Sequence, residues 1–246
     1  MVAETRVALL IDAENASAKT VEFVLSEVAR HGVAHVRRAY GNWKDPSLHP
    51  WEERLHELAI RPIQQFSYTS KKNASDMAMT IDAMDLMYAG NIDSFALMSS
   101  DADFTPLVLR LLTNGKKVYG YGERKTPSAF VNACSQFTYV DSAPTVSDPA
   151  DASSRRRWSS RELRGETRLV NLLRLAVTAS QDEDGWANLA AVGSQVGNQA
   201  SFDPQNYGYK KFGEVIKATE LFESRQHNNV VQVRDRRQRP EQAHQA

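Results

Sequence analysis

Two aspartates lie two residues apart in the stretch "ALMSSDADFTPLV", residues 96–108, just after a short apolar run. Two carboxylates this close repel each other, by about 1 kcal/mol at 4 Å in water and by about 4 kcal/mol at an effective dielectric constant near 20. A third aspartate, Asp12, ends the apolar run "RVALLID", and these motifs contain no histidine or cysteine. Because oxygen ligands alone favour a hard cation, Asp12, Asp101 and Asp103 predict a site for Mg²⁺ or Mn²⁺ rather than zinc.

A fourth acid, Asp76, is predicted to join them from a helix over residues 74–90. At about 100° per residue, Met87 falls within about 20° of Asp76 around that helix, so Asp76 lies on the apolar face that is turned toward the protein. An uncompensated carboxylate there is costly, so a cation, a proton or hydrogen-bond donors are expected beside it. The methionines of this helix are predicted to be core residues, whereas Asp82 and Asp85 are predicted to form a solvated face.

The chemistry that this cluster predicts is phosphodiester hydrolysis, because a hard cation polarises a phosphoryl oxygen and lowers the pKa of a bound water. Neighbouring polar residues suit the same reaction, with Asn15 as a donor to a phosphate oxygen or to the water, Ser99 and Ser100 in either role, and Lys71 and Lys72 as contacts to the substrate backbone. Each type also has a structural interpretation. Asn15 is a good N-cap for the helix that follows, single aspartates near a helix start are most often caps, and paired lysines are common on solvated surfaces.

The elements that must position these residues are short strands alternating with helices. Strands are predicted over residues 6–12, 35–40, 61–68, 94–100, 116–122 and 136–141, and helices over residues 17–32, 49–60, 74–90 and 105–115. This alternation is typical of an α/β fold, a doubly wound parallel sheet with helices on both faces. Such sheets bind ligands beyond the carboxyl ends of their strands, commonly between the first strand and the fourth. Asp12 ends the first predicted strand and Asp101 follows the fourth, so both are expected at that crevice.

Three segments of this region resemble a known family. "LLIDAEN", "KKNASDMAMTIDAMDLM" and "FALMSSDADFTPLVLRLLTNGKKVYGYG" look like the signature segments of the NYN domain, a PIN-like ribonuclease family, and they occur in the same order. The resemblance spans about residues 5–142. It implies a PIN-like fold and a metal-dependent endoribonuclease site whose acids map onto Asp12, Asp76, Asp101 and Asp103, all of which are carboxylates here.

Composition limits the class of protein. With 246 residues, 41% of them apolar and 24% charged, the chain can form one large globular domain or two. Residues 1–145 carry 15 Lys and Arg against 17 Asp and Glu, and residues 146–246 carry 15 against 13, so overall charge does not argue for nucleic acid. A single cysteine, Cys134, excludes an internal disulfide and suits a reducing cytoplasm. Apolar stretches are too short for a signal peptide or a membrane span, so a cytoplasmic protein without a membrane partner is expected.

The sequence changes character twice after residue 142. Residues 143–165 are rich in Ser, Ala, Pro and Asp and then in Arg, with too little apolar content for a core, so a flexible linker is expected. Its arginines fit a solubilising hinge or an RNA-grasping segment equally. Residues 166–236 contain three amphipathic helical patterns followed by two short strands, which is a winged-helix pattern. Residues 237–246 are expected to be a disordered tail.

The stretch "FDPQNYGYKKFGEVIKATELFESRQHNNVVQVRDR" resembles the OST-HTH, or LOTUS, domain. The resemblance implies a winged helix associated with RNA binding or with protein contacts, which leaves a homodimer or another protein partner open. Tyr207, Tyr209, Lys210 and Lys211 combine aromatic rings with positive charges, a mixture suited to stacking bases and contacting phosphates of RNA. In the structural interpretation, Tyr209 or Phe212 packs in the domain core.

Together these features predict a cytoplasmic, Mg²⁺- or Mn²⁺-dependent endoribonuclease. Its first domain, residues 1–142, would cut single-stranded or structured RNA, and its second would hold the RNA. One alternative is a non-catalytic RNA-binding regulator, and another is a DNA-binding regulator, because winged helices also bind DNA. A phosphatase of the haloacid dehalogenase class needs a second aspartate where Glu14 stands, and a receiver domain needs an aspartate after the third strand, where residues 64–73 contain none.

Overall fold

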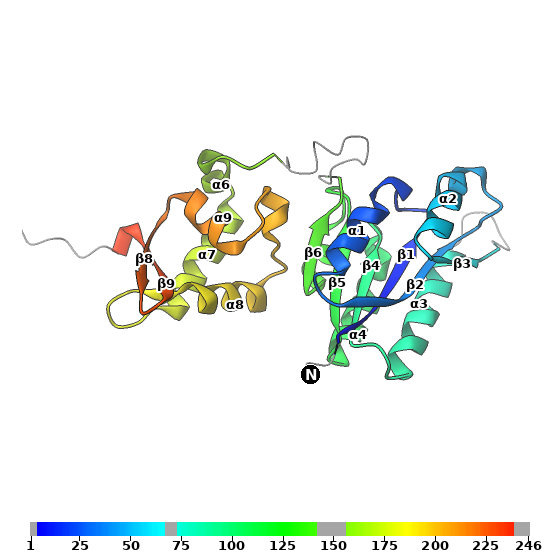
Figure 1. The fold of residues 1–246 in the computed structure, drawn as a ribbon, viewed down its shortest axis with the longest axis horizontal. Helices are drawn as coiled ribbons and strands as arrows, with labels where there is room; N and C mark the ends of the chain where they lie inside the picture. The colour runs from blue at the N-terminus through cyan, green and yellow to red at the C-terminus, as the bar shows by residue number, and fades with distance from the viewer. Residues whose placement is uncertain (1–3, 67–72, 142–155, 239–246) are drawn as a thin grey trace, which may run out of the picture. The chain divides into compact units, whose positions relative to one another are not determined.

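A computed structural model describes residues 4–66, 73–141 and 156–238 of the chain. The chain divides into two compact units, Met1–Ser153 and Ser154–Ala246, each of which is described by itself (Figure 1). Helices long and apolar enough to cross a membrane are absent from the described ranges. Of the predicted tail, only residues 237–238 are described, and they belong to the 3-10 helix Arg236–Gln238.

The first unit is built on a parallel sheet with the strand order β3-β2-β1-β4-β5-β6 (Figure 1). Its strands are β1 (Arg6–Asp12), β2 (Val33–Gly41), β3 (Arg61–Gln64), β4 (Ser94–Met98), β5 (Lys117–Gly122) and β6 (Gln136–Tyr139). Every neighbouring pair is parallel, and the winding reverses between β1 and β4. The predicted α/β doubly wound class is therefore confirmed.

Helices cover both faces of this sheet. On one face lie α1 (Val21–Val28) and α2 (His49–Glu57), and on the other lie α3 (Ala74–Tyr88), α4 (Thr105–Thr113) and α5 (Ser128–Ala133). Helix α5 has only 6 residues, which is too short to show a helical period, and the sequence pattern does not predict it.

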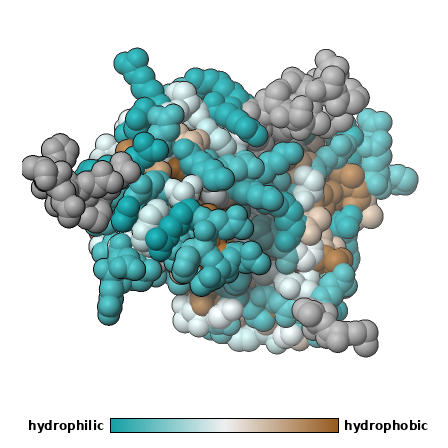
Figure 2. Space-filling model, turned by 60° about the vertical axis from the view of Figure 1, so that its left-hand side comes forward, coloured by the Kyte–Doolittle hydropathy of each residue, from teal (hydrophilic) through white to brown (hydrophobic). Residues whose placement is uncertain are grey.

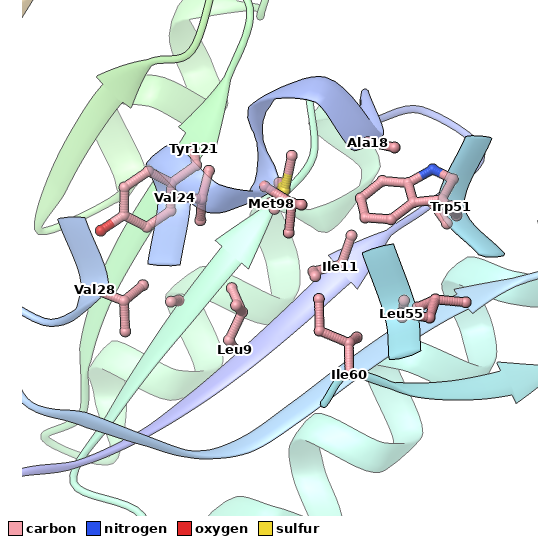
Figure 3. Close-up of a cluster of buried hydrophobic side chains, with 14 of the residues drawn as sticks. Leu9, Ile11, Ala18, Val24, Val28, Trp51, Leu55, Ile60, Met98 and Tyr121 are labelled. Carbon is pink, nitrogen blue, oxygen red and sulfur yellow. The ribbon is translucent and has the colours of Figure 1, made fainter. Parts of the chain in front are cut away.

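The core of the first unit forms on both sides of β1. Leu9 and Ile11 pack toward α1 and α2, where they meet Val24 and Trp51 (Figure 3). Leu10 faces the opposite way, toward α3 and α4. Burial on both faces explains why β1 reads as a continuous apolar run, and each fully buried Leu or Ile contributes about 1.5–3 kcal/mol. The packed run ends at Asp12, so the core fixes where the first acid emerges.

Helix α3 carries apolar residues on two sides, and part of the prediction for it was wrong. Met79 is buried in the core as predicted, but the side chain of Met77 is 62% exposed. Asp82 does not lie on a solvated face. Helix α3 packs against β1 and β2, so Asp82 meets Arg38 and the hydroxyl of Tyr40, both from β2.

The second unit combines helices with a small antiparallel sheet. Its elements are α6 (Ser160–Gly165), α7 (Thr167–Ser180), β7 (Ala187–Asn188), α8 (Leu189–Gln199), α9 (Phe212–Thr219), β8 (Phe222–His227) and β9 (Val230–Asp235). The strand order is β7-β9-β8. The predicted three helices and two-stranded wing are present as α7, α8, α9, β8 and β9. The short β7 and α6 are additions that the sequence pattern does not predict.

Helix α6 lies within the segment predicted to be a flexible linker. Ser159 and Glu162 form a capping box at its start, and Leu163 is fully buried in the core of the second unit. Before the helix, the Trp158 N–H donates a hydrogen bond to the Tyr207 carbonyl at 3.1 Å. The described part of that segment, residues 156–165, therefore belongs to the fold of the second unit. The rest of it, residues 143–155, lies outside the described residues.

The surface is consistent with the burial of most apolar residues in the cores of the two units. On the side of the molecule drawn in Figure 2, hydrophilic side chains dominate and hydrophobic ones form smaller patches. Among the described residues, most buried apolar side chains belong to three clusters, two in the first unit and one in the second.

Candidate active site

Asp12, the last residue of β1, is buried at the carboxyl edge of the parallel sheet, with 1% exposure. Ser99 Oγ donates a hydrogen bond to Asp12 Oδ2 at 2.7 Å. Asn15 Nδ2 donates to the same oxygen at 3.0 Å, and the Asn15 backbone N–H donates to Oδ1 at 3.3 Å. Burial raises the pKa of Asp12, although these hydrogen bonds favour its charged form. These partners are neutral, and no cation among the described residues forms an ion pair with Asp12.

Asp76, in the first turn of α3, faces the same edge. Its pKa is raised to about 7, first by burial and then by the negative charges of Asp12, Asp101, Glu14 and Asp103. Both effects penalise the ionised carboxylate, and the second requires the other acids to be close because repulsion falls with distance. The four acids singled out in the sequence therefore come together in the fold.

Asp101 and Asp103 follow β4, the neighbour of β1 in the sheet. The Asp101 carboxylate accepts a hydrogen bond from the Asp103 N–H at 2.8 Å, so it caps the short 3-10 helix that begins there. The Asp101 N–H donates to Ser99 Oγ at 3.0 Å, which links it through Ser99 to Asp12. Asp103 is exposed and accepts from Asn73 Nδ2 at 3.2 Å. Asp101 is thus both a cap and a member of the acidic cluster.

Glu14 belongs to the cluster as well, although the sequence reasoning gave it no role in the site. One of its carboxylate oxygens accepts from the Asn42 N–H at 3.0 Å, and the other accepts from Ser75 Oγ at 2.8 Å. A signal for it was present: Asp12 and Glu14 repeat, at the end of β1, the two-residue spacing of the acids that follow β4. Two adjacent strands therefore each deliver a pair of acids.

Ser99 and Ser100 hold this edge together. Ser99 is buried between Asp12 and Asp101, so it positions these acids and has no surface for the predicted RNA contact. Ser100 Oγ accepts from the Glu123 N–H at 2.9 Å. Gly122, at the end of β5, lies so close to the Ser99 carbonyl that an added Cβ would come within 2.6 Å of it.

Three other predicted site residues have different outcomes. Lys71 and Lys72, expected to contact the substrate backbone, lie outside the described residues. Asn15 is exposed and donates to Asp12, while Ser17 caps the 3-10 helix Ala18–Thr20, so the N-cap interpretation of Asn15 was wrong. The second Nδ2 hydrogen of Asn15 is a further donor that a phosphate oxygen or a water can accept.

The donor set of this cluster suits a hard cation, since it consists of carboxylate oxygens. In the part of the chain that the structure describes, no three His, Cys, Asp or Glu side chains form a ready-made metal-binding group. Mg²⁺ typically takes one or two carboxylates from the protein and its other ligands from water and substrate phosphates. Burial and then the repulsion between these acids raise the pKa of Asp76 to about 7, and a cluster of this kind fits such a cation.

A separate pocket of about 560 Å³ lies between α2 and β3. Its lining is mainly apolar and includes Trp43, Leu48, Leu55, Ile60 and Pro62. Because it contains none of the clustered acids, it is not the candidate site.

In the second unit, Tyr209 was predicted to contact RNA, and the structural interpretation is the correct one for it. Its side chain is only 8% exposed, its hydroxyl donates to the Trp158 carbonyl at 2.6 Å, and the Arg157 guanidinium lies 5.6 Å from the ring centroid. Phe212 packs against the same core, also as the structural interpretation expects.

Tyr207, Lys210 and Lys211 lie around a tight turn. Tyr207 is half-buried and stacks on Phe202, with ring centroids 5.8 Å apart. Gly208 adopts a φ of +81°, the left-handed region that glycine enters without strain. Lys210 and Lys211 follow this turn and are exposed, so a phosphate can reach them from solvent.

Comparison with known families agrees with this organisation. The family model described as "NYN domain" matches residues 6–141, and the one described as "OST-HTH/LOTUS domain" matches residues 165–234, in the order expected from the sequence. The NYN domain is part of a PIN-like nuclease superfamily, a class of hydrolases that typically use divalent metals. A LOTUS domain indicates RNA binding.

Individual relatives give no further function. An uncharacterized protein of Methanocaldococcus jannaschii is 31% identical over 123 residues, 48% of each chain, so the chain spans about half the length of this curated relative. A solved protein of unknown function from Vibrio parahaemolyticus is 22% identical, with a TM-score of 0.47 over 57% of this chain and 96% of that one. An uncharacterized protein from Nitrosomonas europaea, solved in solution, is 28% identical, with a TM-score of 0.27 over 37% of this chain and 88% of that one.

Proposed function

The chain belongs to the NYN domain family, and on this premise we propose that it is a metal-dependent endoribonuclease whose second unit holds RNA. The observation that carries the proposal is the crowding of acids around Asp76, whose pKa is raised to about 7 at the carboxyl edge between β1 and β4. Doubly wound sheets bind their ligands at this reversal point.

The acids and their neighbours have distinct roles in this proposal. Mg²⁺ or Mn²⁺ would be held by Asp12, Asp76, Asp101 and Asp103, and when bound it supplies a polarised phosphoryl oxygen and a water of lowered pKa. Ser99 donates to Asp12 and accepts from the Asp101 N–H, so it keeps these two carboxylates in one arrangement. Asn15 donates its second Nδ2 hydrogen to a phosphate oxygen or to the attacking water.

The proposed organisation is a nuclease domain over residues 1–142, a linker, and an RNA-binding domain over residues 166–236 to whose fold α6 also belongs. Lys210 and Lys211 support RNA binding because both are exposed and positively charged. We place the protein in the cytoplasm, and the support is its single cysteine, Cys134, which is buried as a free thiol.

A non-catalytic RNA-binding regulator is the second candidate, and one observation favours it. No three acidic side chains of the described residues form a ready-made metal group, and Asp101 uses its carboxylate as a cap. In that case the same edge would bind a cation and RNA without cutting.

The test is cleavage of end-labelled single-stranded and structured RNAs by the full chain with Mn²⁺, with Mg²⁺ or with chelator. Asp101→Asn removes one charge while asparagine still serves as a cap, so folding is preserved and cutting is expected to fall by at least about 100-fold. Asp85→Asn, which changes an exposed acid of the same size on α3, is the matched control and should cut like the wild type. RNA that is bound but stays intact with either metal, equally for Asp101→Asn, would overturn the nuclease in favour of the regulator.

A further inference from the structure

We infer that the RNA at this edge is single-stranded and crosses the sheet between two aromatic–cation pairs, Lys44 with Phe66 on one flank and Arg124 with Tyr139 on the other. This inference rests on the proposed function, because it describes how the same acidic edge would receive its substrate.

The first pair follows β2 and β3. Phe66 lies two residues beyond β3 and is 48% exposed, and Lys44 Nζ, three residues beyond β2, lies 5.1 Å from the centroid of its ring. Single exposed apolar side chains are common on protein surfaces, so exposure alone decides nothing. The position favours a role in binding, because the Phe66 ring and the Lys44 cation lie at the same ends of the strands as the acids.

Hydrogen bonds connect this flank with the acidic cluster. Gln64 Nε2 donates to Asn42 Oδ1 at 2.9 Å, and Gln64 Oε1 accepts from the Trp43 N–H at 3.0 Å. The Asn42 N–H in turn donates to Glu14 at 3.0 Å. The ends of β1, β2 and β3 are thus held in one network, which fixes the root of the Phe66 segment relative to the acids.

The second pair occupies the opposite flank, after β5 and β6. The Arg124 guanidinium lies 5.2 Å from the centroid of the Tyr139 ring, and the Arg124 N–H donates to Asp141 Oδ2 at 3.2 Å. The hydrogen bond from the Glu123 N–H to Ser100 ties this loop to the segment that carries the acids after β4. Arg124 is exposed and Tyr139 is half-buried.

Strand order places these features in a row. From one edge of the sheet to the other come the first pair at β3 and β2, the acids at β1 and β4, and the second pair at β5 and β6. Since all six strands are parallel, their carboxyl ends share one edge, and five spacings of about 4.8 Å make the row about 24 Å long. Cations therefore flank an acidic centre, so a polyanion is attracted at both ends and is repelled in the middle unless a metal bridges it there.

The rings indicate which kind of RNA fits. Bases of a duplex stack on one another, whereas unpaired bases stack on aromatic side chains, and adjacent cations hold the phosphates. The contact of an exposed lysine with a ring is weak, so Lys44 can pivot to a phosphate when a base takes its place over Phe66. Both pairs thus combine a stacking surface with a phosphate contact, which suits an unpaired strand.

The first test locates the RNA on the full chain without requiring cleavage. A single-stranded oligonucleotide that carries 5-iodouridine is crosslinked by light in chelator, and the linked residue is identified by mass spectrometry. We expect crosslinks at Phe66 or Tyr139, and none at either ring for the same sequence in a duplex. Crosslinks confined to the second unit, or equal crosslinking of the duplex at these rings, would overturn the inference.

The second test is kinetic. Phe66→Leu should raise KM for single-stranded RNA about tenfold with kcat unchanged, since stacking on a ring contributes to binding, and Phe66→Tyr should restore it. Tyr88→Leu, which removes an even more exposed ring at the far end of α3, is the control and should leave KM unchanged. Crosslinking at Phe66 without cutting would overturn the proposed nuclease but support RNA binding between the two aromatic–cation pairs. Cutting with an unchanged KM in Phe66→Leu would overturn this mode of RNA binding alone.

Discussion

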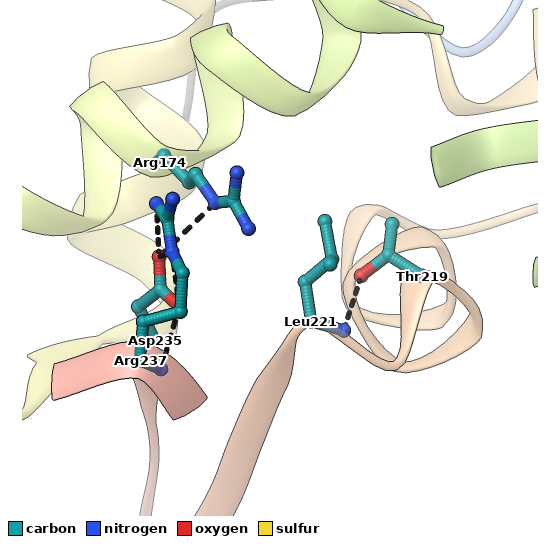
Figure 4. A network of polar contacts seen from close by, with 5 residues as sticks. All are labelled: Arg174, Thr219, Leu221, Asp235 and Arg237. Carbon is teal, nitrogen blue, oxygen red and sulfur yellow. Dashed lines mark hydrogen bonds and ion pairs between the residues drawn. The ribbon is translucent and has the colours of Figure 1, made fainter. Parts of the chain in front are cut away.

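Asp12 and Asp235 are each the last residue of a strand, β1 in the first unit and β9 in the second, and their exposures are 1% and 5%. Asp235 accepts from Arg174 Nε at 3.1 Å and from Arg237 Nη2 at 3.0 Å (Figure 4). Burial by itself would raise the pKa of Asp235, but the hydrogen bonds from Arg237 and the charges of both arginines lower it below the usual value. Asp12 meets only neutral donors among the described residues, and burial raises its pKa.

The difference separates a carboxylate that serves the fold from one that serves a ligand. A buried charge is stable when the protein supplies its counter-ion, as the two arginines do for Asp235. Around Asp12 the fold adds further acids in place of cations, and the pKa of Asp76 is raised first by burial and then by their repulsion. Charge that the protein leaves uncompensated in this way indicates a site for an external cation.

The largest expected effect comes from Asp12→Asn. We expect the rate of RNA cleavage to fall about 1000-fold, because a ligand charge at the reacting phosphate contributes several kcal/mol to the transition state. The free energy of unfolding should change by less than about 1 kcal/mol, since the variant loses one weak hydrogen bond and also removes a buried charge. Cleavage assays and urea denaturation on the same preparation check both values. A strongly destabilised variant would place Asp12 with Asp235, among residues that serve the fold.

Asp235→Asn should show the reverse pattern. We expect the free energy of unfolding of the second unit to fall by about 2 kcal/mol, because Arg174 and Arg237 lose their shared counter-ion and both retain some access to water. Turnover of RNA in the first unit should stay unchanged. Asp184→Asn, at an exposed position of the same unit, is the control for urea denaturation. If Asp235→Asn lowers kcat and leaves stability intact, the contrast with Asp12 disappears.

Cations without an ion pair also occur in the described part of the second unit, which extends the comparison. Among the described residues, Lys210 and Lys211 take part in no ion pair. Changing both to Gln should weaken RNA binding about fivefold and flatten its salt dependence, because each lysine that contacts a phosphate releases counter-ions. Lys217→Gln, an exposed lysine on α9, is the matched control in a titration over several salt concentrations. If Lys217→Gln weakens RNA binding as much as the double variant does, positive charge attracts RNA without a defined site at Lys210 and Lys211.

Much of the first unit was predictable because its signals are local. A strand buried on both faces must be apolar throughout, so β1 and β4 stand out, and the rule for parallel sheets then places Asp12 and Asp101 together. The helical period alone turned Asp76 toward them. These predictions do not require knowing which residues from other elements contact them.

The features that were predicted wrongly depend on non-local contacts, since each involves a partner that is distant in the sequence. Asp82 looked solvated until β2 brought Arg38 and Tyr40 beside it. Tyr209 reads equally well as a stacking ring and as a core ring, and the hydrogen bond of its hydroxyl to the Trp158 carbonyl, 51 residues away, decides between them. A segment rich in Ser and Arg also gave no sign that Leu163 would be buried in the core.

The smallest expected effect is a pair of opposite pH dependences. The pKa of Asp76 rises from 3.8 to about 7 on folding, so its contribution to stability is fully present below about pH 4 and is lost as the pH rises through 7. The pKa of Asp235 is lowered from 3.8, so its contribution is present above that value and is lost as the pH falls through the folded pKa. The two carboxylates therefore make stability change with pH in opposite directions.

Thermal unfolding in chelator, which keeps cations from the acidic cluster, measures this contrast. Asparagine resembles a protonated aspartate, so Asp76→Asn should match the wild type below about pH 4 and raise the Tm of the first unit by about 3 °C at pH 8. Asp235→Asn should lower the Tm of the second unit at pH 8, and the deficit should shrink below pH 4, where the wild-type carboxylate begins to take up its proton. A Tm difference for Asp76→Asn that stays constant from pH 4 to pH 8 would mean that neither burial nor the neighbouring acids raise the pKa of Asp76, and the acidic edge would then give no support for an external cation.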